Sequence, residues 1–393
     1  MLVLLHFHTL GFSPVQLAYL FVLYEIAGVI TNLSAGWVAA RFGLTSTLYA
    51  GLSLQVLALL ALTQLDPAWS ITASVVFVML VQGLSGVAKD LAKMSSKSAV
   101  KILAPATGGG LFRWVATLTG SKNAVKGSGF LLGAVLLAAF GFVPSVLTMA
   151  AVLFVILIGV MTGMPKGLPV GRKDAKFSEV FSKNRNINWL SAARLFLFGA
   201  RDVWFVVGLP IYFYAVLSDG TTESNRTAFF MIGTFMAVWT ILYGIVQGSA
   251  PRILKAASRS NAEILALAKR WVGLLVIVPA FLAGLVWLVP EPSNVLTATI
   301  VLGLLVFGGI FAVNSALHSF LILSLTDAKR VTMDVGFYYM ANSVGRLVGT
   351  VLSGFTYQMG GLSLCLGTAT LMIGLGWLGT SQLKAPKTAK VAA

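Results

Sequence analysis

The sequence predicts an all-α membrane protein made of two successive groups of six transmembrane helices, of which the first helix is incomplete. Three observations predict this fold. Hydrophobic residues make up 58% of the 393 residues, charged residues only 10%, and the mean hydropathy is +0.90, a composition typical of membrane proteins. Apolar stretches of roughly 20 residues, long enough to cross a bilayer as helices, alternate with short turns along the chain. Internal repetition relates the first half to the second.

Eleven apolar stretches are each long enough for one crossing. They are residues 15–39, 45–64, 69–89, 116–140, 145–164, 188–218, 227–250, 271–289, 294–325, 335–357 and 362–381. Met1–Leu10 is apolar but covers only about half a crossing, and it has neither the charged leader nor the cleavage site of a signal peptide. We expect it to be the second half of a first helix whose first half is missing.

A polar, basic segment divides the chain. We predict an N-terminal helical bundle at residues 1–164, a linker at 165–187 and a C-terminal bundle at 188–393. The two halves share short matching stretches in the same order. Asn123–Gly127 corresponds to Asn342–Arg346, and each precedes an apolar run with spaced glycines. Six helices, a basic linker and six helices are the expected architecture.

Basic residues gather in alternate turns. They include Arg41, the lysines after the stretch 69–89 (Lys89, Lys93, Lys97, Lys101), the linker, and the turns that follow the stretches 227–250, 294–325 and 362–381. The opposite turns hold acidic residues, with Arg226 as their one basic residue. Since basic loops stay inside, we expect these turns and both termini to be cytoplasmic. The net charge of +16 is therefore a signal of topology and does not indicate a nucleic-acid surface.

The stretch Asn188–Ser218 carries charges inside an apolar span. Arg194 and Arg201 are seven residues apart and share a helical face, whereas Asp202 points elsewhere and calls for a partner on another helix. An arginine inside a bilayer costs at least a few kcal/mol, so it must face protein or a wet cavity. A buried ion pair that fixes packing is one interpretation. We favour the other, a cationic clamp for an anionic substrate.

Further cations belong to the same hypothesis. Lys122 and Lys126 are four residues apart on the fifth helix, and the repeat places Lys126 near the depth of Arg346 on the eleventh. Arginine meets the oxygens of phosphate or arsenate with paired, charge-assisted hydrogen bonds. Arg201, Lys126 and Arg346 are the principal predicted ligands. For Arg194 and Lys122 a packing or interfacial role is an equal alternative.

Two acids and one histidine remain open between two roles. Glu25 either carries a coupling proton or is the counter-charge of a basic side chain, and we prefer the counter-charge. The same alternatives apply to Asp202, with the structural pair favoured. His318 titrates near neutral pH in the first interpretation and is a hydrogen-bonded packing residue in the second.

Several classes of function are disfavoured. The single cysteine, Cys365, gives neither a disulfide framework nor a paired-cysteine metal site, and His6 and His8 lie on different helical faces. No cluster of nucleophile, base and orienting group is evident, so we expect no enzyme, no metal and no cofactor. The expected partners are the lipid bilayer and a small anion.

A loop motif connects the chain to a known superfamily. Residues 36–43, GWVAARFG, resemble the major facilitator superfamily motif G-x-x-x-D-R-x-G between the second and third helices. Gly36, Arg41 and Gly43 match it, and the resemblance implies a gating loop. Ala40 stands where an aspartate is usual, so the charge-relay part of that role is not expected. The glycines still permit close packing and a sharp turn.

Longer stretches resemble the organoarsenical efflux permeases of the ArsJ type. They are LHFHTLGFSPVQLAYLF, AKDLAKMSSKSAVK, LTGSKNAVKG, NINWLSAARLFLFGARDVWFVV and GFYYMANSVGRLVGTVLSG. The resemblance covers essentially the whole chain. It implies a bacterial inner-membrane transporter that exports 1-arseno-3-phosphoglycerate, which glyceraldehyde-3-phosphate dehydrogenase makes from arsenate, and so confers arsenate resistance. An uptake or exchange carrier for organophosphates is the alternative. Composition and spacing alone do not name arsenic.

Overall fold

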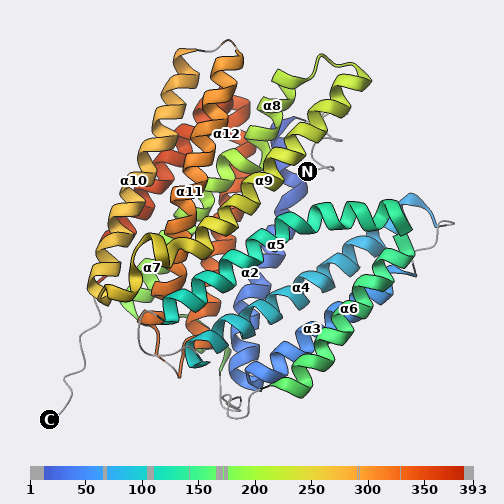
Figure 1. Ribbon diagram of the computed structural model, residues 1–393, viewed down its shortest axis with the longest axis vertical. Helices are drawn as coiled ribbons and strands as arrows, with labels where there is room; N and C mark the ends of the chain where they lie inside the picture. The colour runs from blue at the N-terminus through green and yellow to red at the C-terminus, as the bar shows by residue number, and fades with distance from the viewer. Residues whose placement is uncertain are drawn as a thin grey trace.

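The protein is helical nearly throughout the residues that the structure describes. The computed structural model describes residues 13–64, 69–103, 110–140, 142–164, 171, 176–289, 291, 293–327 and 329–384, and it contains no strand within them (Figure 1). Seven helical segments in these ranges are long and apolar enough to cross a membrane. The predicted class, an all-α membrane protein, is therefore confirmed. The partial first helix predicted at residues 1–10 lies outside the described residues.

Each of the eleven predicted spans falls on helical structure among the described residues. The first half contains α2 (Pro14–Phe42), α3 (Leu44–Leu62), α4 (Ile71–Leu103), α5 (Gly110–Phe140) and α6 (Phe142–Gly163). After the short turn η1 (Phe177–Val180), the second half contains α7 (Arg185–Val203), η2 (Trp204–Gly208), α8 (Leu209–Leu217), α9 (Thr222–Ile253), η3 (Ala256–Ser258), α10 (Asn261–Leu288), α11 (Asn294–Leu325) and α12 (Val331–Ser381). α12 covers two predicted spans. Gly360 and Gly361 interrupt its helical geometry and separate one span from the other.

The prediction that the span 69–89 ends near Lys89 is wrong. α4 continues to Leu103, so Lys93 and Lys97 lie within a helix and not in a turn. Lys89, Lys93 and Lys97 recur every four residues and therefore share one helical face. A hydropathy pattern ends at the first of these charges, whereas an amphipathic helix continues past them.

The two ends of the bundle differ in charge. At one end, where α2 and α9 end and α5 and α7 begin, lie Arg41, Arg252, Arg113 and Arg185; this is called the basic end below. At the opposite end, Asp219 lies in the turn between α8 and α9. Its carboxylate accepts hydrogen bonds from the Ser224 hydroxyl and from the backbone N–H and hydroxyl of Thr221. These bonds lower the pKa of Asp219 to about 2.

The two halves meet along two pairs of helices, α2 with α12 and α5 with α9. A Cβ atom at Gly36 would lie only 2.9 Å from the Thr332 carbonyl oxygen, and one at Gly120 only 2.4 Å from the Gly248 backbone nitrogen. Glycine is therefore required at both crossings. Both lie in the part of the helices nearer the basic end, and Figure 1 shows α5 and α9 diverging from there towards the opposite end.

A π-helical segment interrupts the predicted span 188–218. Pro210 has no backbone N–H to continue the helical ladder, and η2 directly precedes α8, which contains it. The backbone N–H groups of Val207 and Gly208 both donate to the Ser353 hydroxyl of α12, at 3.2 Å each. The irregular turn is thus tied to α12 immediately after Arg201 and Asp202.

The larger hydrophobic core belongs to the second half. Trp204 is completely buried, and its ring meets those of Trp239 and Phe307 edge to face at 5.9 and 5.3 Å. Phe112 of α5 stacks on Phe320 of α11 at 4.9 Å and links the two halves near the basic end. The span 188–218 is consequently held rigidly, which fixes the charges that it carries.

Candidate functional site

Four charged side chains from three helices form one network. Asp202 of α7 pairs with its neighbour Arg201 at 2.5 Å and with Arg346 of α12 at 3.3 Å. Arg346 also donates to Glu25 of α2, which belongs to the other half of the molecule. Glu25 and Asp202 are buried, whereas the two arginines are partly exposed. Arg346 therefore links a carboxylate of each half.

Close contact between α7 and α12 allows this network to form. A Cβ atom at Gly345 would lie 2.1 Å from the Leu195 carbonyl oxygen, and one at Gly349 would lie 2.4 Å from that of Gly199. Because no side chain fits there, the backbones touch and Arg346 reaches Asp202. The predicted need of Asp202 for a partner on another helix is met by Arg346, and Glu25 occupies the position that its counter-charge interpretation requires.

A second polar network connects α2, α4 and α12. Asp90 accepts hydrogen bonds from Thr31 at 2.8 Å, Asn32 at 3.2 Å and Lys93 at 2.8 Å. Lys93 also donates to the Asn32 side-chain oxygen at 2.5 Å, and Asn32 donates to Ser343 at 3.1 Å. Asp90 thus forms an ion pair with Lys93, one turn further along α4.

Arg194 has no carboxylate partner among the described residues. Its guanidinium donates to Asn342 at 2.9 Å and Ser315 at 3.2 Å, and lies 3.6 Å from the centre of the Phe198 ring. Ser315 in turn accepts from Gln247 at 2.9 Å. Arg194 is 3% exposed. Neutral hydrogen-bond acceptors and aromatic faces thus hold a buried positive charge without neutralising it.

Three lysines face the same region from α4 and α5. Lys97 is buried, and its ammonium group has no hydrogen-bond partner among the described residues; it lies 5.3 Å from the centre of the Tyr339 ring. Lys122 and Lys126 have exposed side chains and no ion pair within the described ranges. The charges that act on Lys97 are those of Lys122, Arg194 and Lys93, and the strongest acting on Lys126 is that of Arg346.

Positive charge exceeds negative charge in this region. Eight cationic side chains and three carboxylates interact with one another: Lys89, Lys93, Lys97, Lys122, Lys126, Arg194, Arg201 and Arg346 against Glu25, Asp90 and Asp202. The formal excess is five positive charges. Cations that converge without counter-charges repel one another, and a bound polyanion relieves that repulsion.

The structure thus brings the predicted ligands Arg201, Arg346 and Lys126 into one electrostatic neighbourhood. The charges of Arg194 and Lys122 both act on Lys97, and that of Lys126 acts on Lys122. Sequence reasoning missed Lys93 and Lys97 because they were assigned to a turn. Their spacing of four residues from Lys89 was the available signal.

His318 is buried in α11 near Arg194, whose charge acts on it. Neither of its ring nitrogens has a hydrogen-bond partner among the described residues. The hydrogen bond that the packing interpretation expects is therefore missing in this part of the chain. The described residues also contain no group of three or more His, Cys, Asp or Glu side chains arranged to hold a metal ion.

The predicted gating loop connects α2 to α3. Gly43 has φ 89°, a left-handed conformation that favours glycine, and it permits the sharp turn between the helices. Gly36 packs on Gly336 of α12 at the crossing of the two halves, and Arg41 lies 5.7 Å from the centre of the Trp37 ring. The loop therefore adjoins the contact between the halves.

No family model and no curated protein sequence matches this chain. Several solved structures match the fold of this chain. A bacterial homologue of the iron transporter ferroportin, in an outward-facing state, has a TM-score of 0.73 at 14% identity and covers 93% of this chain and 89% of its own. The human organic anion transporter MFSD10 (TETRAN) has a TM-score of 0.65 at 15% identity, with coverages of 93% and 84%. The proton:xylose symporter XylE, bound to 6-bromo-6-deoxy-D-glucose, has a TM-score of 0.65 at 12% identity, with coverages of 92% and 84%.

XylE is a major facilitator superfamily protein. The likeness extends over more than nine-tenths of the chain, so the protein has the fold of that superfamily, and the predicted fold class is confirmed. Identities this low concern the fold alone and leave the substrate open.

Proposed function

We propose that the protein is a secondary transporter that exports 1-arseno-3-phosphoglycerate, a small organic anion, by alternating access. The observation that carries the proposal is the excess of positive charge where helices of both halves meet. Transporters of this kind bind their substrates at the interface of two repeats. No group that reacts chemically with a substrate is part of the proposal, which is for transport and not for catalysis.

The proposed ligands differ in how strongly they are already engaged. Arg201 and Arg346 share Asp202, so an anion that reaches them competes with one carboxylate for two guanidinium groups. Lys126 has no ion pair among the described residues and is available to an anion without that competition. Arg194 and Lys122 extend the cationic region. The proposed primary contacts are therefore Arg201, Arg346 and Lys126.

Two ends of the substrate suit two parts of this region. A molecule with an arsenate group and a phosphate group presents two tetrahedral oxyanions, separated by a short carbon chain. Arg201 and Arg346 form one pair of fork-shaped donors, and Arg194 with Lys97 forms a second, more deeply buried group of cations. Such an arrangement favours a doubly anionic molecule over a singly charged one.

Arsenic enters the proposal through the sequence resemblance to the ArsJ-type permeases. Glyceraldehyde-3-phosphate dehydrogenase would supply the substrate, and export would give arsenate resistance. The cations themselves accept any organophosphate, so an uptake or exchange carrier for organophosphates is the second candidate. The structural likeness to a protein described as an organic anion transporter agrees with both candidates.

The proposed orientation places the basic end in the cytoplasm of a bacterium and the protein in its inner membrane, following the distribution of basic residues. Glycine crossings hold the two halves together nearer that end. The divergence of α5 and α9 towards the opposite end supports an outward-facing arrangement, in which substrate would be released outside. Rocking of the halves about the charged site would reverse it.

Transport into everted membrane vesicles tests the proposal. Vesicles that contain the protein should accumulate 1-arseno-3-phosphoglycerate, and excess 3-phosphoglycerate should compete weakly, because it presents a planar carboxylate in place of the tetrahedral arsenate group. Arsenate-exposed cells that lose the protein should retain more arsenic. Lower retention on loss of the protein would indicate an uptake carrier instead, and no accumulation in vesicles would refute export. Repeating the assay with and without a pH gradient shows whether protons drive it.

A further inference from the structure

A separate basic pocket lies between the two halves. It has a volume of about 780 Å³ and is formed by α5, by the end of α9 and by η3. Its lining combines basic and hydroxyl side chains with small residues, among them Arg113, Arg252, Lys255 and Thr117. None of these residues belongs to the charged site described above.

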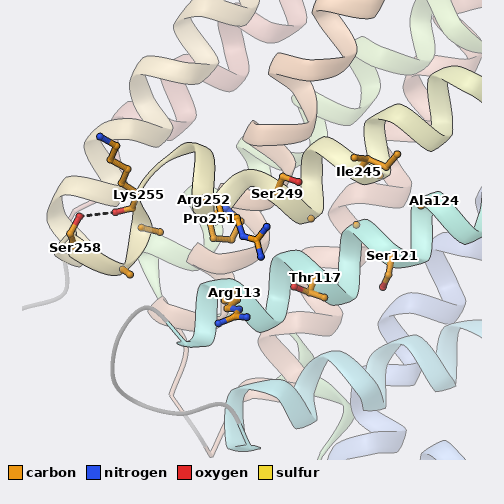
Figure 2. Close-up of a pocket in the computed structure, with 15 residues that line it drawn as sticks. Arg113, Thr117, Ser121, Ala124, Ile245, Ser249, Pro251, Arg252, Lys255 and Ser258 are labelled. Atoms are coloured by element: carbon orange, nitrogen blue, oxygen red, sulfur yellow. Dashed lines mark hydrogen bonds between the residues drawn. The ribbon is translucent and has the colours of Figure 1, made fainter.

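Two arginines dominate the chemistry of this pocket. Figure 2 shows the guanidinium group of Arg252 at the edge of α9 that faces α5 and that of Arg113 over α5 itself; both residues line the pocket, as does Thr117. Within the described residues neither arginine has a hydrogen bond or an ion pair. Lys255 lines the pocket as well, but its side chain points away from α5 (Figure 2). Two unneutralised guanidinium groups and nearby hydroxyls suit a phosphate diester.

The surroundings of the pocket indicate where such a phosphate comes from. Ile245 lines the pocket and is 53% exposed, and Trp114 and Ile253, which follow the lining residues Arg113 and Arg252 in the chain, are exposed too. Apolar side chains that face outward from membrane-spanning helices contact acyl chains, and tryptophan is enriched at the membrane interface. A phosphate in this pocket therefore has hydrocarbon-binding surface next to it, as a phospholipid requires and a soluble phosphate does not.

We propose that this pocket binds the headgroup of an anionic phospholipid from the leaflet at the basic end of the bundle. Basic pockets between transmembrane helices are suited to such headgroups. Because Arg113 belongs to one half and Arg252 to the other, the bound headgroup bridges them at the crossing where Gly120 touches Gly248. The lipid consequently stabilises the arrangement in which the halves are closed at this end.

Lipid binding to the purified, full-length protein tests this proposal. Native mass spectrometry measures the affinity for phosphatidylglycerol and for phosphatidylcholine. We expect tighter binding of phosphatidylglycerol, weakened about fivefold by Arg113→Gln or by Arg252→Gln and about 25-fold by both together. Arg270→Gln removes an exposed basic residue outside this pocket, at the same end of the bundle, and should change the affinity less than twofold.

Three results would overturn the proposal. They are equal binding of the two lipids by the wild-type protein, unchanged affinity in the double variant, and an equal loss in Arg270→Gln. Displacement of phosphatidylglycerol by inorganic phosphate at the same free concentration would assign the pocket to a soluble anion. If the double variant does not fold, the two single variants give the same comparison. Lipid binding is measured without transport, so the result is independent of the proposed substrate.

Discussion

Arg201 and Arg346 share one carboxylate, yet their replacement by glutamine should affect stability to different degrees. When Arg201 is replaced, Asp202 keeps its 3.3 Å contact with Arg346, so no buried charge loses its last partner. When Arg346 is replaced, Glu25 loses its one ion pair among the described residues and stays buried at 4% exposure. The first variant tests substrate binding, and the second tests how the halves are held together.

The magnitudes follow from these contacts. A partly exposed ion pair contributes about 1 kcal/mol or less, so Arg201→Gln should leave the unfolding temperature close to that of the wild type. Leaving a buried carboxylate unpaired costs about 3–5 kcal/mol, so Arg346→Gln should lower it clearly. Arg201→Gln also loses one charge-assisted contact to an oxyanion, worth about 1.5–3 kcal/mol. Its transport of the substrate should therefore be about 10- to 100-fold weaker than that of the wild type.

The assay combines thermal unfolding of the purified variants with uptake of 1-arseno-3-phosphoglycerate into everted vesicles at matched protein levels. Arg201→Lys is the matched control: it keeps the charge but not the fork, and should lose less transport than Arg201→Gln. Wild-type transport by Arg201→Gln would remove Arg201 from the binding site. A drop in stability as large as that of Arg346→Gln would show that Arg201 serves packing only.

Three further predictions concern other parts of the structure. Lys97→Met removes a buried ammonium group without a hydrogen-bond partner among the described residues, so unfolding measurements should show about 1–3 kcal/mol of added stability while vesicle transport falls; lower stability would contradict this. Gly36→Ala places a Cβ atom 2.9 Å from the Thr332 carbonyl oxygen and should cost about 1–3 kcal/mol in the same measurement, whereas Gly159→Ala, where no atom lies within 4 Å, should be neutral. The pKa of Asp219 is lowered to about 2, so its hydrogen bonds to Thr221 and Ser224 stabilise the turn above the ordinary pKa of about 4 and are lost as the pH falls through about 2. Hydrogen exchange at the Thr221 amide should report this loss, and a transition near pH 4 would refute the assignment.

Hydropathy predicted the helices well where apolar residues continue to the helix end. α11 spans Asn294–Leu325, the range that its apolar stretch predicts. The hydropathy pattern did not predict the end of α4, because Lys93 and Lys97 lower the hydropathy of a segment that is buried all the same. The sequence shows the charge of Lys93 without showing which neighbouring helix makes its burial tolerable. Lys93 donates to Asn32 of α2 as well as to Asp90 of its own helix.

The candidate site was predictable in composition but not in pairing. Arg201, Arg346 and Lys126 stand out because charges are rare in apolar spans, and each is found in the charged region. The link between Glu25 and Arg346 joins residues 321 positions apart, and no local pattern specifies it. It depends on how α2 crosses α12, which the glycine contacts decide. Distances of this kind come only from the packed structure.

In the proposed transport cycle, Arg346 connects substrate binding to movement of the two halves. Its guanidinium is held by Glu25 from one half and by Asp202 from the other, so it is a direct electrostatic tie between them. An anion that binds Arg346 competes with both carboxylates for the same donors, which weakens the tie while Arg201 still balances Asp202. A ligand can shift a conformational equilibrium only through different interactions in the two states. Competition at Arg346 supplies such a difference, because the anion and Glu25 cannot both occupy the same donors, whereas the neutral hydrogen bonds of Arg194 carry no link to a carboxylate of the first half.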